Sequence, residues 1–202
     1  MAWTSLPNAG FTPGEPVTQA QGLALRDNPQ AIAERGTGAP IVQVPKVDYY
    51  TSGTTWAIPS EVTAFSVVIV GGGGGGGDFG SGNDGADTTF TYDGVTLTAG
   101  KGGGGGGASG NAGSAGTATN GDLNLAGIQG SNAENQRIYA PEGMKNYGFG
   151  GRGSGGGGPG GSAGAVIMRF DVNAAAPNPT FVVGAGGSGG DNGKGGIIII
   201  TY

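Results

Sequence analysis

The stretch that decides the fold is residues 63–77, which read TAFSVVIVGGGGGGG. The first eight residues are mostly β-branched or apolar, a composition typical of a strand in a sheet. The seven glycines that follow have no side chains, so burial in a hydrophobic core gives them nothing. The sequence therefore predicts an apolar strand joined directly to a polyglycine segment whose stability must come from its backbone.

The glycine runs are long enough to limit how they can fold. Uninterrupted glycines occupy residues 71–77, 102–107 and 155–158. Ordering each residue opposes folding by about 1 to 2 kcal/mol, and hydrogen bonds between backbones are the available compensation. In a threefold extended helix of polyproline II type the N–H and C=O groups point outward, so neighbouring runs can bond to one another. We expect packed polyglycine II helices, with structural positions at Gly71, Gly74, Gly77, Gly102, Gly104, Gly107, Gly155 and Gly158.

Further strands are expected between the glycine runs. Residues 88–92 and 95–99 flank Asp93-Gly94, a two-residue connection typical of a type I′ hairpin. Later strands are predicted at residues 165–172, 180–183 and 197–202. The last of these has four consecutive isoleucines, which suggests burial on both faces. The predicted fold class is mainly β, with a small sheet or sandwich core packed with polyglycine II helices.

The first 50 residues are predicted to form a separate segment. Six prolines interrupt it, which leaves room for one short helix near residues 17–28. Most of the segment should be extended, and its few apolar side chains cannot offset the entropy lost on ordering. We interpret residues 1–50 as an anchor that attaches to another protein and residues 51–202 as a glycine-rich β domain.

The composition disfavours several function classes. The chain has neither cysteine nor histidine, so the commonest general base and transition-metal ligand are missing. No residue is assigned as catalytic, cofactor-binding or metal-ligating, and we expect no enzyme activity and no cofactor. A net charge of −5 opposes attraction to nucleic acid or anionic lipid. The N-terminus lacks the pattern of a signal peptide and no apolar run is long enough to span a membrane, so synthesis in a cytoplasm is expected.

Two motifs around the first glycine run match functional patterns loosely. The run contains GxGxxG after a strand, but seven glycines match this nucleotide-binding pattern trivially and no helical pattern follows. Asp78, Asp84 and Asp87 are hard oxygen ligands that a calcium ion prefers. Turns rich in aspartate, asparagine and glycine are also expected in any long surface loop. The loop interpretation is favoured over a calcium site.

Within the glycine-rich region, larger side chains are found mainly at residues 118–149. They either fold back as a local core or are displayed on loops for recognition. If they are displayed, the loops that make the contact are residues 78–87 and 118–149, and the candidate receptor-binding residues are Phe79, Arg137, Tyr139, Tyr147 and Phe149.

Several segments together resemble the glycine-rich domain of bacteriophage tail fibre and adhesin proteins. They are VVIVGGGGGGG, FTYDGVTLTAGKGGGGGG, GGGGPGGSAGAVIMRF and FVVGAGGSGGDNGKGGIIIITY, and the resemblance covers residues 56–202. It implies a slab of polyglycine II helices whose connecting loops gather at a tip and contact a receptor on the host surface. It also implies a location in the virion, attachment to other virion proteins through the N-terminal segment, and a homo-oligomer, with a trimer favoured.

Other functions stay open at this level. A capsid or neck decoration protein with a purely structural role is the main alternative to a tail fibre or tail tip component. An ice-binding protein is disfavoured because no regular repeat is present. A hydrolase is disfavoured because no paired carboxylates or activated nucleophile can be recognised.

Overall fold

The computed structural model describes residues 18–33, 45–107, 110–130, 147–151, 161–174 and 177–202. The chain divides into two units, Met1–Pro45 and Lys46–Tyr202. The boundary predicted at residue 50 therefore lies a few residues too late. Strand β1 (Val47–Tyr50) pairs with the last strand, β9 (Ile197–Thr201), and so belongs to the second unit.

The described part of the first unit is a single helix, α1 (Gln19–Ala33). Thr18 caps its N-terminus, because the Thr18 hydroxyl accepts the Gln21 N–H at 3.3 Å while the Gln21 side chain accepts the Thr18 N–H at 2.7 Å. This reciprocal pair is a capping box. The helix continues through Pro29 to Ala33, so the end predicted at residue 28 is wrong. Proline has no N–H to donate, but here it does not end the helix.

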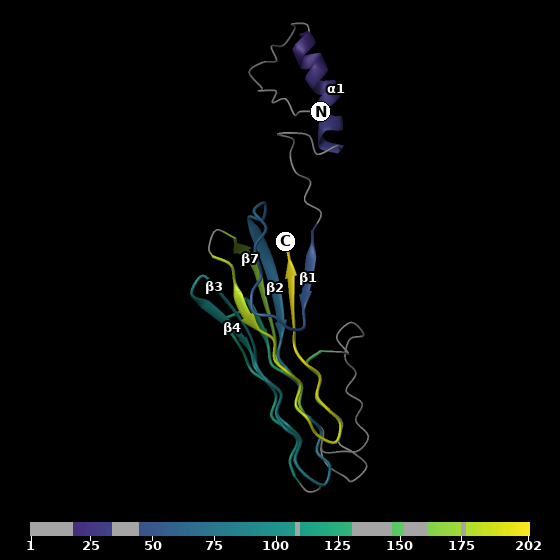
Figure 1. Cartoon of the computed structure of the whole chain (residues 1–202), viewed down its shortest axis with the longest axis vertical. Coiled ribbons are helices and arrows are strands. Elements are labelled where there is room, and N and C mark those ends of the chain that lie inside the picture. The colour runs from purple at the N-terminus through teal and green to yellow at the C-terminus, as the bar shows by residue number, and fades with distance from the viewer. Residues whose placement is uncertain (1–17, 34–44, 108–109, 131–146, 152–160, 175–176) are drawn as a thin grey trace. The chain divides into compact units, whose positions relative to one another are not determined.

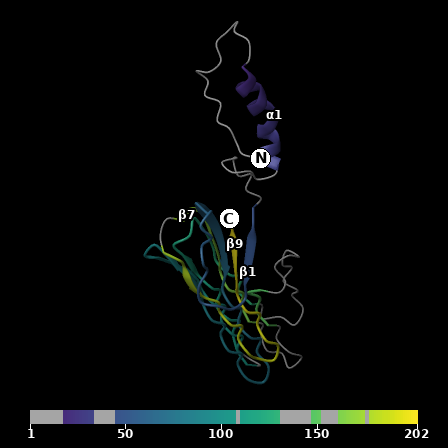
Figure 2. The same cartoon turned by 45° about the horizontal axis from the view of Figure 1, so that its top comes forward.

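The second unit contains two antiparallel sheets, which confirms the predicted mainly β fold (Figures 1 and 2). The five-stranded sheet has the order β1-β9-β2-β7-β6, with β2 at Ala64–Val70, β7 at Val166–Asn173 and β6 at Leu123–Leu125. The four-stranded sheet has the order β5-β4-β3-β8, at Ala118–Thr119, Val95–Ala99, Thr88–Tyr92 and Thr180–Val182. The strands expected from the sequence are all present, whereas the short strands β1, β5 and β6 were not predicted.

The hairpin between β3 and β4 has the predicted turn. Asp93 and Gly94 have φ angles of 49° and 72°, and a type I′ turn requires a positive φ at both of its central residues. The two strands pair in register from Thr88 opposite Ala99 to Tyr92 opposite Val95.

The hydrophobic core lies between the sheets and is centred on Phe65. Its ring is 2% exposed and lies 5.0 Å from the ring of Trp56 and 5.2 Å from that of Tyr92, both at steep angles. Ile198 and Ile200 of β9 are fully buried in the same cluster. Ile199 between them is only partly buried, so the burial expected for both faces of the isoleucine run does not extend to Ile199.

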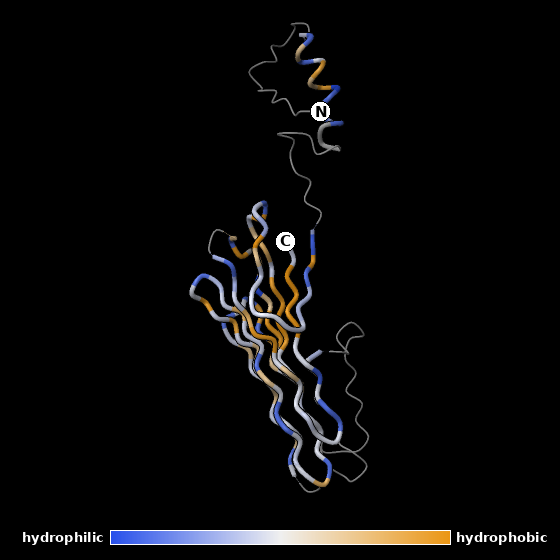
Figure 3. Tube along the Cα trace, in the orientation of Figure 1, coloured by the Kyte–Doolittle hydropathy of each residue, from blue (hydrophilic) through white to orange (hydrophobic). Residues whose placement is uncertain are grey.

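Glycine-rich segments continue from the strands at one end of the sandwich (Figures 1 and 3). We call these segments the glycine bundle, and its described residues are 71–77, 82–87, 100–107, 110–117, 127–130, 148–151, 161–165, 184–190 and 191–196. In Figure 3 the hydrophobic colour is concentrated in the strands, and the bundle is pale or blue. The bundle is therefore held by something other than apolar burial.

We predict that a chain beginning at Lys46 folds as the full chain does. The described strands and the described core cluster of the sandwich lie between Lys46 and Tyr202, so removing residues 1–45 takes away none of these core side chains. Circular dichroism should show the same β signal, and the thermal midpoint should shift by no more than a few degrees. Loss of the cooperative transition would show that the first unit is needed for folding.

Candidate functional site: the glycine bundle and its tip

The central segment of the bundle is Gly71–Gly76. All six of its N–H groups donate to carbonyl oxygens of other segments, at 2.8 to 3.0 Å. The acceptors lie in three segments, and each segment is used by every third residue of the run. Residues 71 and 74 donate to Ala165 and Ser162, residues 72 and 75 to Ala86 and Asn83, and residues 73 and 76 to Lys194 and Asp191.

The carbonyl groups of the same run accept from three further segments. Residues 72 and 75 accept from Gly102 and Gly105, residues 73 and 76 from Gly187 and Gly190, and residue 74 from Gly151. The segments that accept run antiparallel to the central one, because their numbers fall as the central numbers rise. The segments that donate at two positions run parallel to it.

The central run thus bonds to six neighbours with a repeat of three residues. Three residues per turn, with N–H and C=O groups directed outward, is the geometry of an extended helix of polyproline II type. An α-helix or a strand would place its bonds differently, since the first bonds within itself and the second has only two neighbours. The hydrogen bonds of the central run have the repeat of three residues that the expected polyglycine II helix would have.

The spacing between segments leaves no room for side chains. A Cβ atom added at Gly74 would lie 2.1 Å from the carbonyl oxygen of Gly103, and one added at Gly104 would lie 2.1 Å from that of Gly82. Both contacts are with backbone atoms, which cannot rotate away as a flexible side chain can. At Gly80, in the turn after the central run, an added Cβ would meet nothing within 4 Å. Glycine is therefore required at Gly74 and Gly104 but not at this turn.

Two aspartates complete the hydrogen bonding of a second segment, residues 100–107. Its N–H groups donate in the same repeat of three, to residues 117, 114 and 111 and to residues 72 and 75. On the remaining side Lys101 and Gly104 donate to the carboxylates of Asp87 and Asp84, at 2.8 and 2.9 Å. The two carboxylates, three residues apart, take the places of backbone acceptors.

The Asp84 carboxylate is held by two groups. The N–H of Gly104 has the largest effect and the Lys101 ammonium, 3.1 Å away, the next, and together they lower the pKa of Asp84. Two of the three aspartates considered as calcium ligands, Asp84 and Asp87, therefore accept hydrogen bonds from backbone N–H groups of the bundle. In the part of the chain that the structure describes, no three carboxylates come close enough to hold a metal ion.

Turns connect the segments at the end of the bundle farthest from the strands (Figure 1). We call the turns at residues 78–81 and 188–192 the tip. Gly80 accepts the Asp78 N–H at 2.9 Å, and the side chain of Asn192 accepts the Gly189 N–H at 3.2 Å. Phe79, in the first turn, is 86% exposed. A large apolar side chain held in solvent on a short hydrogen-bonded turn is available for contact with a partner.

The other candidate receptor-binding residues are placed differently from Phe79. Tyr147 and Phe149 are partly buried, and the Phe149 carbonyl accepts the Lys194 N–H within the bundle. Arg137 and Tyr139 lie outside the described residues, as do the structural glycines Gly155 and Gly158. The six other predicted structural glycines lie within the glycine bundle.

The two predicted display loops are in part regular structure. Residues 82–87 form a bonded segment of the bundle, and residues 118–119 and 123–125 form the strands β5 and β6. Only residues 78–81 of the first loop remain as a turn. The carboxylates at Asp84 and Asp87 were missed as structural acceptors, although their spacing of three residues was a signal of the bundle's repeat.

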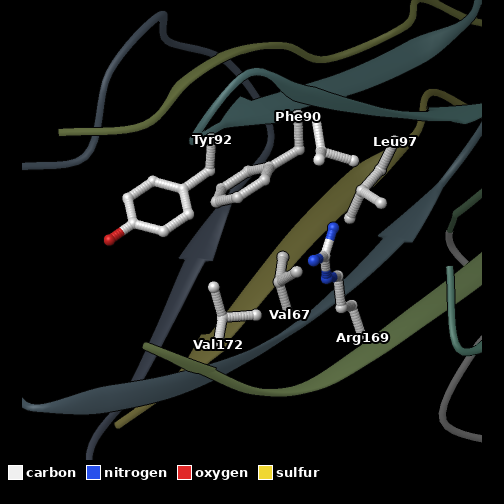
Figure 4. Close-up of a pocket in the computed structure, with 7 residues that line it drawn as sticks. Val67, Phe90, Tyr92, Leu97, Arg169 and Val172 are labelled. Atoms are coloured by element: carbon white, nitrogen blue, oxygen red, sulfur yellow. The ribbon is translucent and has the colours of Figure 1, made fainter. Parts of the chain in front are cut away.

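A small pocket opens between the two sheets, lined by Val67, Phe90, Tyr92, Val95, Leu97, Arg169 and Val172 (Figure 4). Its volume is about 10 Å³, which is at the limit for a single water molecule. The pocket is therefore too small to hold a substrate or a cofactor.

Comparisons with protein-family models, with curated proteins and with solved structures give no match to this chain. Among the described residues, no helix combines the length and the apolar character needed to cross a membrane.

We predict that Gly74→Val and Gly104→Val destabilise the second unit by at least about 3 kcal/mol, because each forces backbones apart and breaks several hydrogen bonds. The matched control is Gly80→Val, which meets open space. Thermal and urea unfolding of the three variants measure the difference. Equal midpoints for Gly74→Val and Gly80→Val would show that the central run is not closely packed.

We also predict that Asp84 contributes to acid sensitivity. Its pKa is lower in the folded state than in the unfolded state, so its stabilisation is present above the unfolded pKa, near 3.9, and is lost as pH falls through the lower folded value. Urea unfolding at several pH values should show a shallower loss below about pH 4 for Asp84→Asn. The control Asp93→Asn removes the same charge at the hairpin turn, and an identical pH profile for both variants would contradict the assignment.

Proposed function

We propose that the chain is a structural protein of a bacteriophage virion, a tail fibre or tail tip component that contacts the host receptor through the turns at the end of the glycine bundle. The observation that carries this proposal is the exposure of Phe79 at the tip of a frame made of mutually bonded backbones. The sequence resemblance to phage adhesins supports the same function.

The bundle suits display because it is stiff but chemically uniform. Its central run bonds to six neighbouring segments, and its interior offers no room for a side chain at most glycines. A frame of this kind cannot distinguish one receptor from another. Specificity must then come from the turns, where side chains return.

The tip combines one aromatic ring with small polar groups. Asp78 and Ser81 lie in the same turn as Phe79, and Asp191 and Asn192 lie in the other turn of the tip. Exposed aromatic side chains on rigid turns contribute most to binding energy when a partner covers them, and the polar groups around them fix orientation. This chemistry fits a non-covalent receptor contact, and the proposed role is binding rather than catalysis.

The first unit would provide the attachment to the particle. The described core residues of the sandwich lie in the second unit, and the proposed role of the first unit is to bind another virion protein. The proposed location is therefore the virion, with the second unit carried outward.

We predict that Phe79→Ala weakens adsorption of the purified protein to host cells by about 30-fold, as expected for a central aromatic contact worth about 2 kcal/mol. The control is Val182→Ala, which also removes an exposed apolar side chain, on β8. Unfolding curves of both variants should match the parent. Parent-like adsorption of Phe79→Ala would reject the tip as the receptor contact and favour the structural role of a capsid or neck decoration protein.

A further inference from the structure

The chain enters the second unit at the end of the sandwich opposite to the glycine bundle. The first unit ends at Pro45, and β1 begins with Val47 opposite Thr201, the last residue of β9. The other end of β9, Ile197, directly follows the bundle segment 191–196. Strand β1 therefore runs from the entry of the chain toward the bundle, beside a strand that comes out of the bundle.

The strand on the other side of β9 leads directly to the tip. Strand β2 pairs with β9 from Ser66 opposite Thr201 to Val70 opposite Ile197. After Val70 the chain continues into the central segment of the bundle and then into the turn that carries Phe79 (Figure 1). A pull on this turn is therefore transmitted into β2, and a pull on the chain before β1 is transmitted into β1. Strand β9 lies between the two and holds them together.

A force between the chain entry and the tip acts along the strands. Strands β1 and β2 are both antiparallel to β9, so the force draws the beginning of β1 and the end of β2 in opposite directions. The hydrogen bonds of an antiparallel ladder are perpendicular to the strands, so all bonds between β1 and β9 are loaded together. Bonds loaded together share the force, whereas bonds at a peeling end break one at a time. The fold thus loads this ladder in the more resistant of the two geometries.

The ladder between β1 and β9 begins at the first residue of the second unit. The Lys46 N–H donates to the Tyr202 carbonyl at 2.7 Å, and the Tyr202 N–H donates to the Lys46 carbonyl at 3.0 Å. From this pair to Tyr50 opposite Ile198 the register has no interruption. The strand is therefore bonded to its neighbour from the point at which the force would be applied.

Strand β1 and the residues after it are also joined to the four-stranded sheet. The Tyr50 ring lies 5.0 Å from that of Phe181 on β8, and the Thr54 carbonyl accepts the Phe181 N–H at 2.8 Å. The Asp48 carboxylate accepts the indole N–H of the buried Trp56 at 3.2 Å. Drawing β1 out of its sheet therefore requires breaking contacts with both sheets and with the core.

We propose that β1 is a mechanical clamp, which keeps the second unit folded when tension is applied between Lys46 and the tip. The inference rests on the proposed function for the source of the tension, because attachment through the first unit and a receptor contact at the tip would load the protein at these two points. The resistance itself belongs to the second unit and is measured without a receptor. Failure of the receptor contact would therefore leave the clamp in place.

The first test is force spectroscopy on single molecules of the full chain. The chain has no cysteine, so two introduced cysteines define where the force is applied. Pro45→Cys with Gly80→Cys loads the ladder along the strands. Pro45 is exposed, and a Cβ added at Gly80 meets nothing within 4 Å. The control is Pro45→Cys with a cysteine added after Tyr202, which pulls on adjacent ends of β1 and β9 and opens the ladder one pair at a time.

At the same loading rate, the force at first rupture should be several times higher in the first geometry than in the control. Forced unfolding is governed by the unfolding rate, and this rate is lower when many bonds must break together. Equal forces in the two geometries, or a lower force in the first, overturn the proposal.

The second test compares two tyrosines that are neighbours on β1, with the force applied between positions 45 and 80. Tyr50 packs on Phe181 of the other sheet, whereas Tyr49 is 66% exposed. Tyr50→Ala should lower the rupture force, and Tyr49→Ala should leave it at the parental value, with thermal unfolding used to check that both variants fold. A Tyr50→Ala variant that ruptures at the parental force overturns the clamp even if the first test gives a high force, because another part of the unit then limits the resistance.

Discussion

Close approach between glycine backbones is the constraint on which the rest of the structure depends. The six N–H groups of Gly71–Gly76 reach six carbonyl oxygens on three other segments only because no Cβ atom separates the chains. Each bond contributes a modest net stabilisation. These bonds are numerous, and the repeat of three residues distributes them among several neighbouring segments. Together they stabilise a region that has almost no apolar side chains.

The local features of the fold could be predicted from the sequence because they depend on local patterns. Apolar runs such as Ala64–Val70 indicated strands, and Asp93-Gly94 indicated the turn that the structure contains. The end of α1 was wrong because the proline rule was applied as an absolute stop. The short strands β1 and β6 were missed because three or four residues do not establish an alternating pattern.

The arrangement of the bundle could not be predicted in the same way. That glycine runs must bond through their backbones followed from their lack of side chains. Which runs become neighbours did not, because one glycine is chemically identical to the next. The roles of the larger side chains in the bundle could be predicted only in part. Phe79 was predicted to be displayed to a partner. Asp84 and Asp87 were considered as metal ligands, whereas their carboxylates replace carbonyl oxygens as hydrogen-bond acceptors.

The backbone bundle also changes how the molecule should respond to temperature. Unfolding a hydrophobic core raises the heat capacity because apolar surface meets water, whereas exposure of peptide groups lowers it. In the second unit the apolar surface is confined to the sandwich, and the bundle exposes mainly backbone when it opens. The heat capacity change per residue should therefore fall below that of an ordinary domain. The stability curve should be correspondingly flat, so that the frame weakens little on cooling.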